Sequence, residues 1–391
     1  MGYVGLPLAV AFADAGVDVV CLDSDPERAA ALAAGESYIE DIPSAELSRL
    51  RERLHPTTEA AGLGECEAIV ICVPTPLTSE REPDLSYLLA AGESVAGVLR
   101  AGQLVVLEST TYPGTTREEL APLLERGGLR AGEEFNLAFS PERIDPGRTD
   151  FDVRTTPKLV GGLTAACAER AQELYGLICD EVVPLSSPEA AEMSKLLENV
   201  FRSVNIAFVN ELSQLCDRLG IDVWEVVDAA ATKPFGFMRF DPGPGMGGHC
   251  LPVDPFYLAF KAREHDFYPE FIELAGKVNR AQPAYCVDRI ARALNEMEKP
   301  VKGSRVLLLG VSYKAGVGDI RESPALEIAG LLDDLPDVDA HPVAEHRQLV
   351  DERDVDRAED VLEQLRELRR LGRGDLDDLV ADQVVERDGA L

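Results

Sequence analysis

The chain has 391 residues, 46% of them hydrophobic, which is enough for roughly two or three domains with buried cores. Its 70 acidic and 38 basic residues give a formal net charge of −32. This charge excludes nucleic acid and anionic membranes as favoured partners, because both repel an acidic protein. Acidic residues occur along the whole chain, which favours a halophilic, salt-adapted protein over an ordinary acidic enzyme.

The eight cysteines form no CxxC pair and no regular framework, which indicates reduced thiols and a cytoplasmic location. No stretch reaches the roughly 18 consecutive apolar residues of a membrane span. The N-terminal residues also lack the basic segment of a signal peptide. The sequence therefore predicts an intracellular protein with no membrane partner.

The chain begins with a glycine-containing turn, an alanine-rich helical stretch and a strand. Gly2 and Gly5, with Tyr3 and Val4 between them, match the second and third glycines of a G-x-G-x-x-G dinucleotide fingerprint. Asp23 ends the strand, where an acid binds an adenosine ribose and favours NAD over NADP. We expect the first strand of this fold to be missing. The alternative is an ordinary helix start that contains glycines.

Strand-like and helical runs then alternate, which predicts a Rossmann-type parallel sheet with helices on both faces. The predicted strands are 68–73, 104–107 and 135–139, and the predicted helices are 85–99 and 115–124. Thr75, Thr110 and Glu142 lie just beyond the ends of these three strands, where such sheets bind ligands. Each residue could instead cap a helix or form a turn, but their shared position favours a site.

A helical middle region begins after Pro188. Its predicted helices are 189–219, 223–231, 254–263 and 271–295. Lys195 and Asn199 are four residues apart and therefore share one helical face, either at a site or on a solvated surface. A region built on such a long helix predicts a homodimer.

A glycine-rich loop, 243–255, interrupts these helices with the sequence GPGMGGHCLPVDP. Glycine lets the backbone approach a ligand closely, so the four glycines ahead of Cys250 favour a nucleophilic thiol. Asp254 follows the cysteine by four residues. A cysteine buried for packing is the main alternative. Zinc binding by His249 and Cys250 is less favoured, because no second cysteine or histidine stands at metal-ligand spacing.

A second strand–loop–helix unit follows, with a strand at 304–310 and a helix from Ala325 to about residue 333. Ser323 is predicted to cap this helix, with Pro324 at its first position. Beyond Pro336 the pattern weakens, and the strand candidates are 338–341 and 380–385. The predicted domains are 1–183 for NAD binding, 184–300 as a central helical domain, and 301–391 as a partial second Rossmann-like domain that is degenerate after about residue 336.

Seven strings in this order resemble motifs of the UDP-glucose/GDP-mannose dehydrogenase family. They are GYVGLPLA at 2–9, VPTPL at 73–77, ESTTYPGTT at 108–116, SPERIDPG at 140–147, EMSKLLENVFRSVNIAFVNEL at 192–212, GPGMGGHCLPVDP at 243–255 and SYKAGVGDIRESPAL at 312–326. The resemblance extends to about residue 336. Within the family, the GGHC-x-PVDP form is similar to the branch that oxidises UDP-N-acetylhexosamines, UDP-N-acetyl-D-mannosamine in particular. UDP-glucose and UDP-N-acetylglucosamine are the alternative substrates.

The resemblance implies a four-electron oxidation of the sugar C6 alcohol to a carboxylate with two NAD+. Cys250 would capture the intermediate aldehyde as a thiohemiacetal and then hold the acyl group as a thioester. Lys195 and Asn199 would stabilise the oxyanion. The residues assigned to the hydrolytic water are Asp254, Glu142 and Thr110.

The resemblance also implies binding residues and a biological setting, the synthesis of polysaccharide or glycan. The residues for NAD are Gly2, Tyr3, Val4, Gly5, Asp23, Thr75, Thr110 and Arg321. Those for the UDP-sugar are Glu142, Arg143, Lys195, Asn199, Arg239, Phe240, Gly248 and Lys314. Because both ends of the chain depart from the family pattern, a catalytically impaired nucleotide-sugar-binding relic is the alternative from another functional class.

Overall fold

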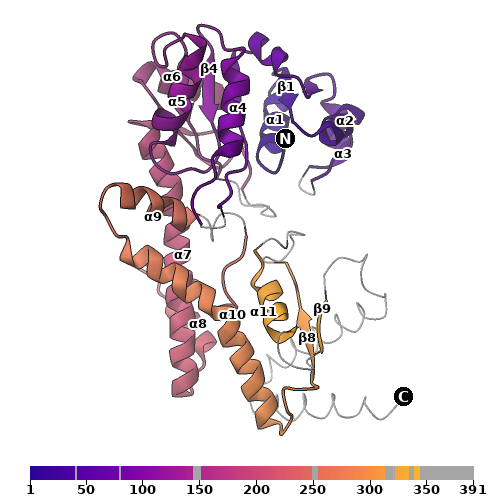
Figure 1. Cartoon of the computed structure of the whole chain (residues 1–391), viewed down its shortest axis with the longest axis vertical. Coiled ribbons are helices and arrows are strands. Elements are labelled where there is room, and N and C mark those ends of the chain that lie inside the picture. Colours follow the sequence, from indigo (N-terminus) through magenta and orange to yellow (C-terminus); the bar gives the residue numbers. More distant parts are fainter. Residues whose placement is uncertain are drawn as a thin grey trace. The chain divides into compact units, whose positions relative to one another are not determined.

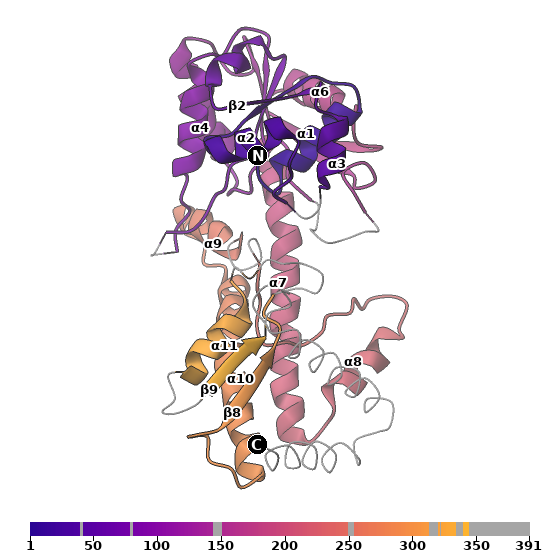
Figure 2. The same cartoon turned by 90° about the vertical axis from the view of Figure 1, so that its right-hand side faces the viewer.

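The computed structural model describes residues 1–39, 42–78, 81–143, 151–248, 254–312, 320, 322–333 and 339–343. The chain divides into two compact units, Met1–Gln282 and Pro283–Leu391. Figures 1 and 2 show the elements of each unit from two directions.

The first unit contains a five-stranded sheet with the strand order β3-β4-β5-β6-β7. Its strands are β3 (Ala68–Ile71), β4 (Leu104–Leu107), β5 (Asn136–Phe139), β6 (Lys158–Gly162) and β7 (Val182–Leu185). The first three are parallel, which confirms the predicted sheet. The pattern did not predict β6, which pairs antiparallel with β5, or β7, which pairs parallel with β6.

Strand β4 has helices on both of its faces, as the alternating pattern predicted. Val105 and Leu107 belong to one core cluster with residues of α4 (Ser86–Ala96) and α5 (Ala121–Leu124). Leu104 and Val106 belong to another with residues of α1 (Gly5–Asp14) and α6 (Ala165–Tyr175). All four side chains of β4 are buried, which accounts for a strand that is apolar without alternation.

The N-terminal strands form a separate two-stranded parallel sheet of β1 (Val19–Leu22) and β2 (Leu54–Thr57). The helices α2 (Pro26–Ala34) and α3 (Ser44–Arg49) accompany it. Helix α2 begins where the Asp25 side chain accepts a hydrogen bond from the Glu27 N–H, and it ends at Gly35, whose φ of 76° suits glycine. These elements place Asp23 directly after β1. Three short helices complete this part of the unit: η1 (Ala60–Glu65), the π-helix η2 (Thr115–Leu120) and η3 (Glu125–Gly127).

The long helix α7 (Pro188–Leu219) connects the sheet to the other helices of the first unit. Ser187 caps its start by accepting a hydrogen bond from the Ala190 N–H, and Gly220 ends it with φ of 67°. Near its start, the buried Glu192 carboxylate accepts hydrogen bonds from the Gly114 and Thr116 N–H groups and the Thr116 hydroxyl, at 2.6 to 2.9 Å. These contacts fix α7 against the sheet domain.

The remaining helices of the middle region also match the prediction closely. They are α8 (Val223–Ala231), α9 (Asp254–Glu264) and α10 (Glu270–Glu296). Helix α10 contains Pro283 and continues across the boundary between the two units. Within the described residues, no helix is both long and apolar enough to cross a membrane.

In the second unit, β8 (Arg305–Leu309) pairs in parallel with β9 (Asp339–Val343), and α11 (Pro324–Asp333) lies between them in sequence. The Ser323 hydroxyl accepts a hydrogen bond from the Ala325 N–H at 3.3 Å, which confirms the predicted cap. The strand candidate at 338–341 is confirmed as β9. The candidate at 380–385 lies outside the described residues.

Strand β6 and the start of α7 pack so closely that a side chain at Gly161 has no room. A Cβ there would lie 2.9 Å from the Pro188 Cα and still closer to the Ser187 carbonyl oxygen. We predict that Gly161→Ala lowers the free energy of unfolding by about 2 kcal/mol, measured by chemical denaturation. Gly97→Ala is the matched control, because its Cβ would meet its nearest neighbours at 3.7 Å and its φ of −66° suits alanine. Equal stability of the two variants would contradict this prediction.

Candidate active site

The loops that follow β3 and β4 are held together by side-chain hydrogen bonds. The Thr75 hydroxyl donates to the Thr110 carbonyl oxygen at 2.6 Å. The Ser109 hydroxyl donates to the Val73 carbonyl oxygen at 2.7 Å and accepts a hydrogen bond from the Val73 N–H at 3.0 Å. The structure thus brings Thr75 and Thr110 together at the carboxyl edge of the sheet, as their sequence positions predicted.

Glu142 and Arg143 follow β5 at the same edge. The Glu142 carboxylate lies 3.6 Å from the Lys158 ammonium. The Arg143 guanidinium pairs with Glu198 of α7 at 2.8 Å and donates to the Pro157 carbonyl oxygen at 2.6 Å. Arg143 therefore ties the end of β5 to the helix turn that carries Asn199.

Lys195, Asn199 and Asp254 form the centre of the candidate site. Asn199 is 8% exposed and Asp254 1% exposed, and the Asn199 amide donates a hydrogen bond to the Asp254 carboxylate. Burial raises the pKa of Asp254 to about 6, although the charge of Lys195 and the Asn199 hydrogen bond both act to lower it. A solvated face is thereby excluded for Asn199, and Lys195 is half-buried.

Helix α9 brings Asp254 to the strand-end loops. The Tyr257 hydroxyl, one turn after Asp254, donates to the Thr75 carbonyl oxygen and lies 3.4 Å from the Pro76 carbonyl oxygen. The Tyr257 side chain is fully buried. The centre on α7 and the loops after β3 and β4 are therefore parts of one polar region.

The glycine-rich loop is anchored by two buried asparagines that sequence reasoning missed. The Gly243 N–H donates to the Asn210 side-chain oxygen at 2.9 Å, and the Asn210 amide donates to Asn279 at 3.0 Å. The Asn279 amide donates in turn to the Ser203 carbonyl oxygen at 3.1 Å. Asn210 stood inside the string FVNEL, but nothing in that string identifies its partner.

Positive φ angles within the loop confirm the need for glycine there. Gly245 has φ of 143° and Gly248 has φ of 93°, and Gly248 is buried. Both conformations are strained for any residue with a Cβ. The predicted nucleophile Cys250 and its neighbour His249 lie outside the described residues, as do Lys314 and Arg321.

The residues expected to bind NAD form a suitable cradle. Helix α1 begins at Gly5 after a turn through Tyr3 and Val4, and a Cβ on Gly5 would lie 3.4 Å from the Cβ of Cys72, just after β3. Gly2 accepts a hydrogen bond from Leu6 through its carbonyl oxygen. Such close packing of a helix N-terminus against a strand end is the arrangement that receives a pyrophosphate.

Asp23 fits the ribose-binding role. It is buried, which acts to raise its pKa, but hydrogen bonds from the Met1 amino group and the Asp25 N–H outweigh burial and lower the pKa. The carboxylate is therefore ionised at neutral pH and can accept hydrogen bonds from ribose hydroxyls. The glycine cradle and this acid together fit NAD.

Two of the predicted substrate-binding residues have other observed partners. The exposed Arg239 pairs with Asp228 at 2.7 Å and with Asp241 at 2.9 Å. The Phe240 ring packs edge-on against Phe201 of α7, with 5.9 Å between the ring centroids. Their contacts with a substrate stay predictions.

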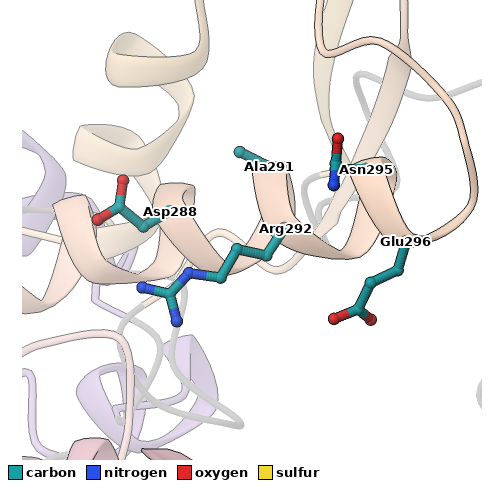
Figure 3. Close-up of a pocket in the computed structure, with 5 residues that line it drawn as sticks. All are labelled: Asp288, Ala291, Arg292, Asn295 and Glu296. Atoms are coloured by element: carbon teal, nitrogen blue, oxygen red, sulfur yellow. The ribbon is translucent and has the colours of Figure 1, made fainter.

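A shallow polar hollow of about 440 Å³ lies along α10 (Figure 3). Its lining residues are Asp288, Ala291, Arg292, Asn295 and Glu296. All five come from one helix, and none was predicted to take part in chemistry. Among the residues that the structure describes, no three His, Cys, Asp or Glu side chains are grouped as metal ligands.

Comparison with protein families decides which group of enzymes this chain belongs to. Residues 1–178 match the NAD binding domain, and residues 189–281 the central domain, of the UDP-glucose/GDP-mannose dehydrogenase family. The chain belongs to this family. It is an NAD-dependent nucleotide-sugar dehydrogenase, and the predicted fold class, enzyme class and cofactor are confirmed.

Individual relatives agree with this assignment. The chain is 39% identical over 330 residues to the UDP-N-acetyl-D-glucosamine 6-dehydrogenase of Pseudomonas aeruginosa, covering 84% of this chain and 77% of that one. It is 38% identical over 338 residues to the UDP-N-acetyl-D-mannosamine dehydrogenase of Pyrococcus horikoshii, covering 85% and 79%. The solved structure of the UDP-D-ManNAc dehydrogenase from Pyrococcus horikoshii superposes with a TM-score of 0.83 at 36% identity, covering 89% and 84%.

Burial of Asp254 leads to a pH-dependent stability. Its folded-state pKa of about 6 lies above the ordinary value of 3.8, so the folded protein binds this proton more tightly than the unfolded chain. The stability that this bound proton gives the folded protein is fully present below about pH 4 and is lost as the pH rises through about 6. We predict that Asp254→Asn raises the free energy of unfolding by about 2 kcal/mol at pH 7 and by much less at pH 4, while activity falls.

Chemical denaturation at both pH values measures the difference. Asp180→Asn is the control, because this exposed carboxylate pairs with the exposed Arg154 and contributes little at either pH. A destabilised Asp254→Asn protein at pH 7 would contradict the prediction.

Proposed function

We propose that the protein oxidises C6 of a UDP-N-acetylhexosamine, with UDP-N-acetyl-D-mannosamine favoured, to the uronate. The overall reaction converts one alcohol, two NAD+ and one water into one carboxylate, two NADH and three protons. The observation that carries the proposal is the buried Asn199–Asp254 hydrogen bond beside Lys195, at the carboxyl edge of the sheet. The relatives described above are named for oxidation of UDP-N-acetylhexosamines, which supports this substrate class.

NAD, when bound, accepts the hydride in each of the two oxidation steps. Gly2, Tyr3, Val4 and Gly5 would hold its pyrophosphate at the start of α1, and Asp23 would accept hydrogen bonds from its ribose. Thr75 and Thr110, tied to each other at the sheet edge, would border the same molecule. Arg321 is proposed to contact it from the second unit.

Cys250 is the proposed nucleophile. In the sequence it lies between Gly248 and Asp254, two buried residues of the site. It follows Gly248 by two residues and precedes Asp254 by four. Its thiolate would add to the aldehyde carbon to form a C–S bond, and the oxygen would become an oxyanion. Lys195 and Asn199 would stabilise that oxyanion by charge and by hydrogen bonding.

Hydrolysis of the thioester needs a base and a positioned water. Water would attack the acyl carbon, the C–S bond would break, and the thiolate would leave. Asp254 is suited to accept a proton from this water, because a carboxyl with a pKa of about 6 is mostly ionised at pH 7 and still a better base than an ordinary aspartate. Glu142 and Thr110 would hold the water from the strand-end loops.

The remaining proposals concern substrate binding and domain roles. Arg143, Arg239, Phe240, Gly248 and Lys314 would contact the UDP-sugar. Residues 1–183 would bind NAD, 184–300 would carry the chemistry, and 301–391 would bind the nucleotide sugar. The two family matches, which end at residue 178 and begin at residue 189, support the first of these boundaries.

A panel of UDP-sugars tests the reaction. We expect two NADH per sugar, with UDP-N-acetyl-D-mannosamine giving the highest kcat/KM. Cys250→Ser should form no uronate and should lower kcat by more than about a hundredfold, because the aldehyde cannot be captured. Cys66→Ser is the matched control, since Cys66 directly follows η1 and its thiol donates to the Gly62 carbonyl oxygen, outside the residues of the site.

The readout is NADH absorbance together with analysis of the sugar product. Full turnover by Cys250→Ser would contradict the covalent mechanism. Thermal stabilisation by UDP-sugars without any NADH would identify a nucleotide-sugar-binding relic instead.

We further propose that α7 forms a homodimer interface. The large apolar side chains exposed along this helix include Leu197, Phe201, Phe208, Leu215 and Leu219. Their separations of four and seven residues place them on one face, over about 33 Å of helix. An apolar stripe of this length is typical of a surface that a second protein covers.

Substitution within the stripe tests the dimer. We predict that Phe208→Glu converts a dimer into a monomer, because a carboxylate buried in an apolar interface loses its hydration without gaining a partner. Light scattering coupled to size-exclusion chromatography measures the mass. Leu177→Glu, at an exposed leucine that follows α6, is the control and should remain dimeric. A dimeric Phe208→Glu protein, or a monomeric wild type, would exclude this interface.

A further inference from the structure

A buried ion pair lies next to Glu142, one of the residues of the proposed site. The Lys158 ammonium at the start of β6 contacts the Glu108 carboxylate at the end of β4, and the two residues are 6% and 1% exposed. The fully buried Tyr175 of α6 donates its hydroxyl hydrogen bond to the other oxygen of Glu108. Its ring centroid lies 5.2 Å from the Lys158 nitrogen. Glu108 and Tyr175 together hold the ammonium in one place.

The fold itself does not require this pair. Removing two charges from water is costly, and well-packed apolar side chains of similar volume often stabilise a core as well or better. The surrounding strands supply such side chains, as the fully buried β4 demonstrates. The position of the pair therefore points to chemistry, and the group that it faces is the Glu142 carboxylate, 3.6 Å from the ammonium.

We propose that Lys158 is a positioning residue for Glu142. Its buried ammonium, held by Glu108 and Tyr175, keeps the Glu142 carboxylate ionised and fixed where it can accept a hydrogen bond from the water that hydrolyses the thioester, while Asp254 takes the proton. This role for Glu142 rests on the proposed function. Lys158 touches no reacting atom and acts through Glu142 alone.

The charges around the pair support this role. The ionisable groups of the described residues that face it are Glu108, Glu142, Lys158, Tyr175, Cys72 and Cys179. Burial alone lowers the pKa of Lys158, but the charges of Glu108 and then Glu142 outweigh it and raise the pKa above its usual range. Burial raises the pKa of Tyr175 and Cys72 well above their usual values and that of Cys179 to about 11. These three groups are therefore neutral, and among these described groups Lys158 is the cation that favours the ionised form of Glu142.

Glu108 modulates the effect. Burial acts to raise the pKa of Glu108, and the charge of the Lys158 ammonium beside it acts to lower it. Arg143, the next residue after Glu142, is engaged by Glu198.

The experiment compares Glu108→Gln with Glu108→Gln/Lys158→Met. Removing Lys158 alone would leave the Glu108 carboxylate buried and unpaired, which threatens folding. Glutamine at 108 keeps a partner for Tyr175 without that charge, so the two variants differ only in the Lys158 cation. Arg154→Met in the Glu108→Gln background is the matched control, since it removes an equal charge from an exposed pair with Asp180.

We expect the loss of Lys158 to move the acid limb of the pH profile of kcat upward by about one pH unit, because Glu142 then takes up a proton more readily. At a pH on the acid limb, kcat should fall by up to about tenfold, with little change well above the limb and little change in KM. Lys158→Arg in the same background keeps a cation at this position, so the acid limb should lie close to that of Glu108→Gln. The control, Arg154→Met, should leave the acid limb at the same pH as in Glu108→Gln. Asp254 also titrates near pH 6, but its neighbouring cation is Lys195, so its contribution is common to all variants.

An unchanged acid limb in the double variant would overturn the inference, whatever its thermal stability. Glu142→Gln, measured in parallel, separates this failure from failure of the proposed function. If Glu142→Gln retains the wild-type kcat, the proposed role of Glu142 is wrong. If it loses activity while the double variant keeps the profile of Glu108→Gln, only the role of Lys158 is wrong.

Discussion

The hydrogen bond between Asn199 and Asp254 joins two segments that are 55 residues apart in the sequence. One segment is the long helix α7, which Glu192 fixes to the sheet domain, and the other is the end of the glycine-rich loop. Together with the hydrogen bond between Gly243 and Asn210 of α7, this contact brings Lys195 and the loop into one site. Because the amide and the carboxylate are both buried, neither group can exchange its partner for water at low cost. The geometry of the whole site depends on this interaction.

Burial of acidic groups recurs throughout the site. Glu108, Glu192 and Asp254 are each at most 1% exposed, and burial raises the pKa of each to about 6 or 7. Their usual values are 4.5 for glutamate and 3.8 for aspartate. Each lies where the sheet meets another layer of the structure. A protein with this many acidic residues could place them all in solvent, so the burial of these three represents stability given up for position and reactivity.

The sequence predicted those elements that carry a clear local signal and missed those that do not. Strand β4 and helix α8 match their predicted bounds, since one is apolar throughout and the other has a clear cap at Asp222. Strand β7 contains Pro184, which lacks a donor for the sheet and is tolerated because β7 lies at the edge. Strand β6 begins with a charged lysine and ends in two glycines, a pattern that resembles a loop.

The site was predictable to a similar degree. Motif spacing placed Lys195 and Asn199 on one face, and the strand ends indicated Thr75, Thr110 and Glu142. Lys158, Asn210 and Asn279 were missed, because each acts through a partner at least 16 residues away in sequence, Glu142 for Lys158 and each other for the asparagines. Burial of a polar side chain is a property of the tertiary structure. A single lysine or asparagine within a helix or strand gives no local sign of it.

Helix α10 contains a proline one turn after a residue that holds the glycine-rich loop. Pro283 has no N–H, so the carbonyl oxygen of Asn279, four residues earlier, receives no hydrogen bond from within the helix. The same Asn279 holds the glycine-rich loop through Asn210, and Pro283 is the first residue of the second unit. The turn of α10 that lacks this backbone hydrogen bond is therefore also the turn that holds the glycine-rich loop. A substitution of Pro283 would reach the loop through Asn279.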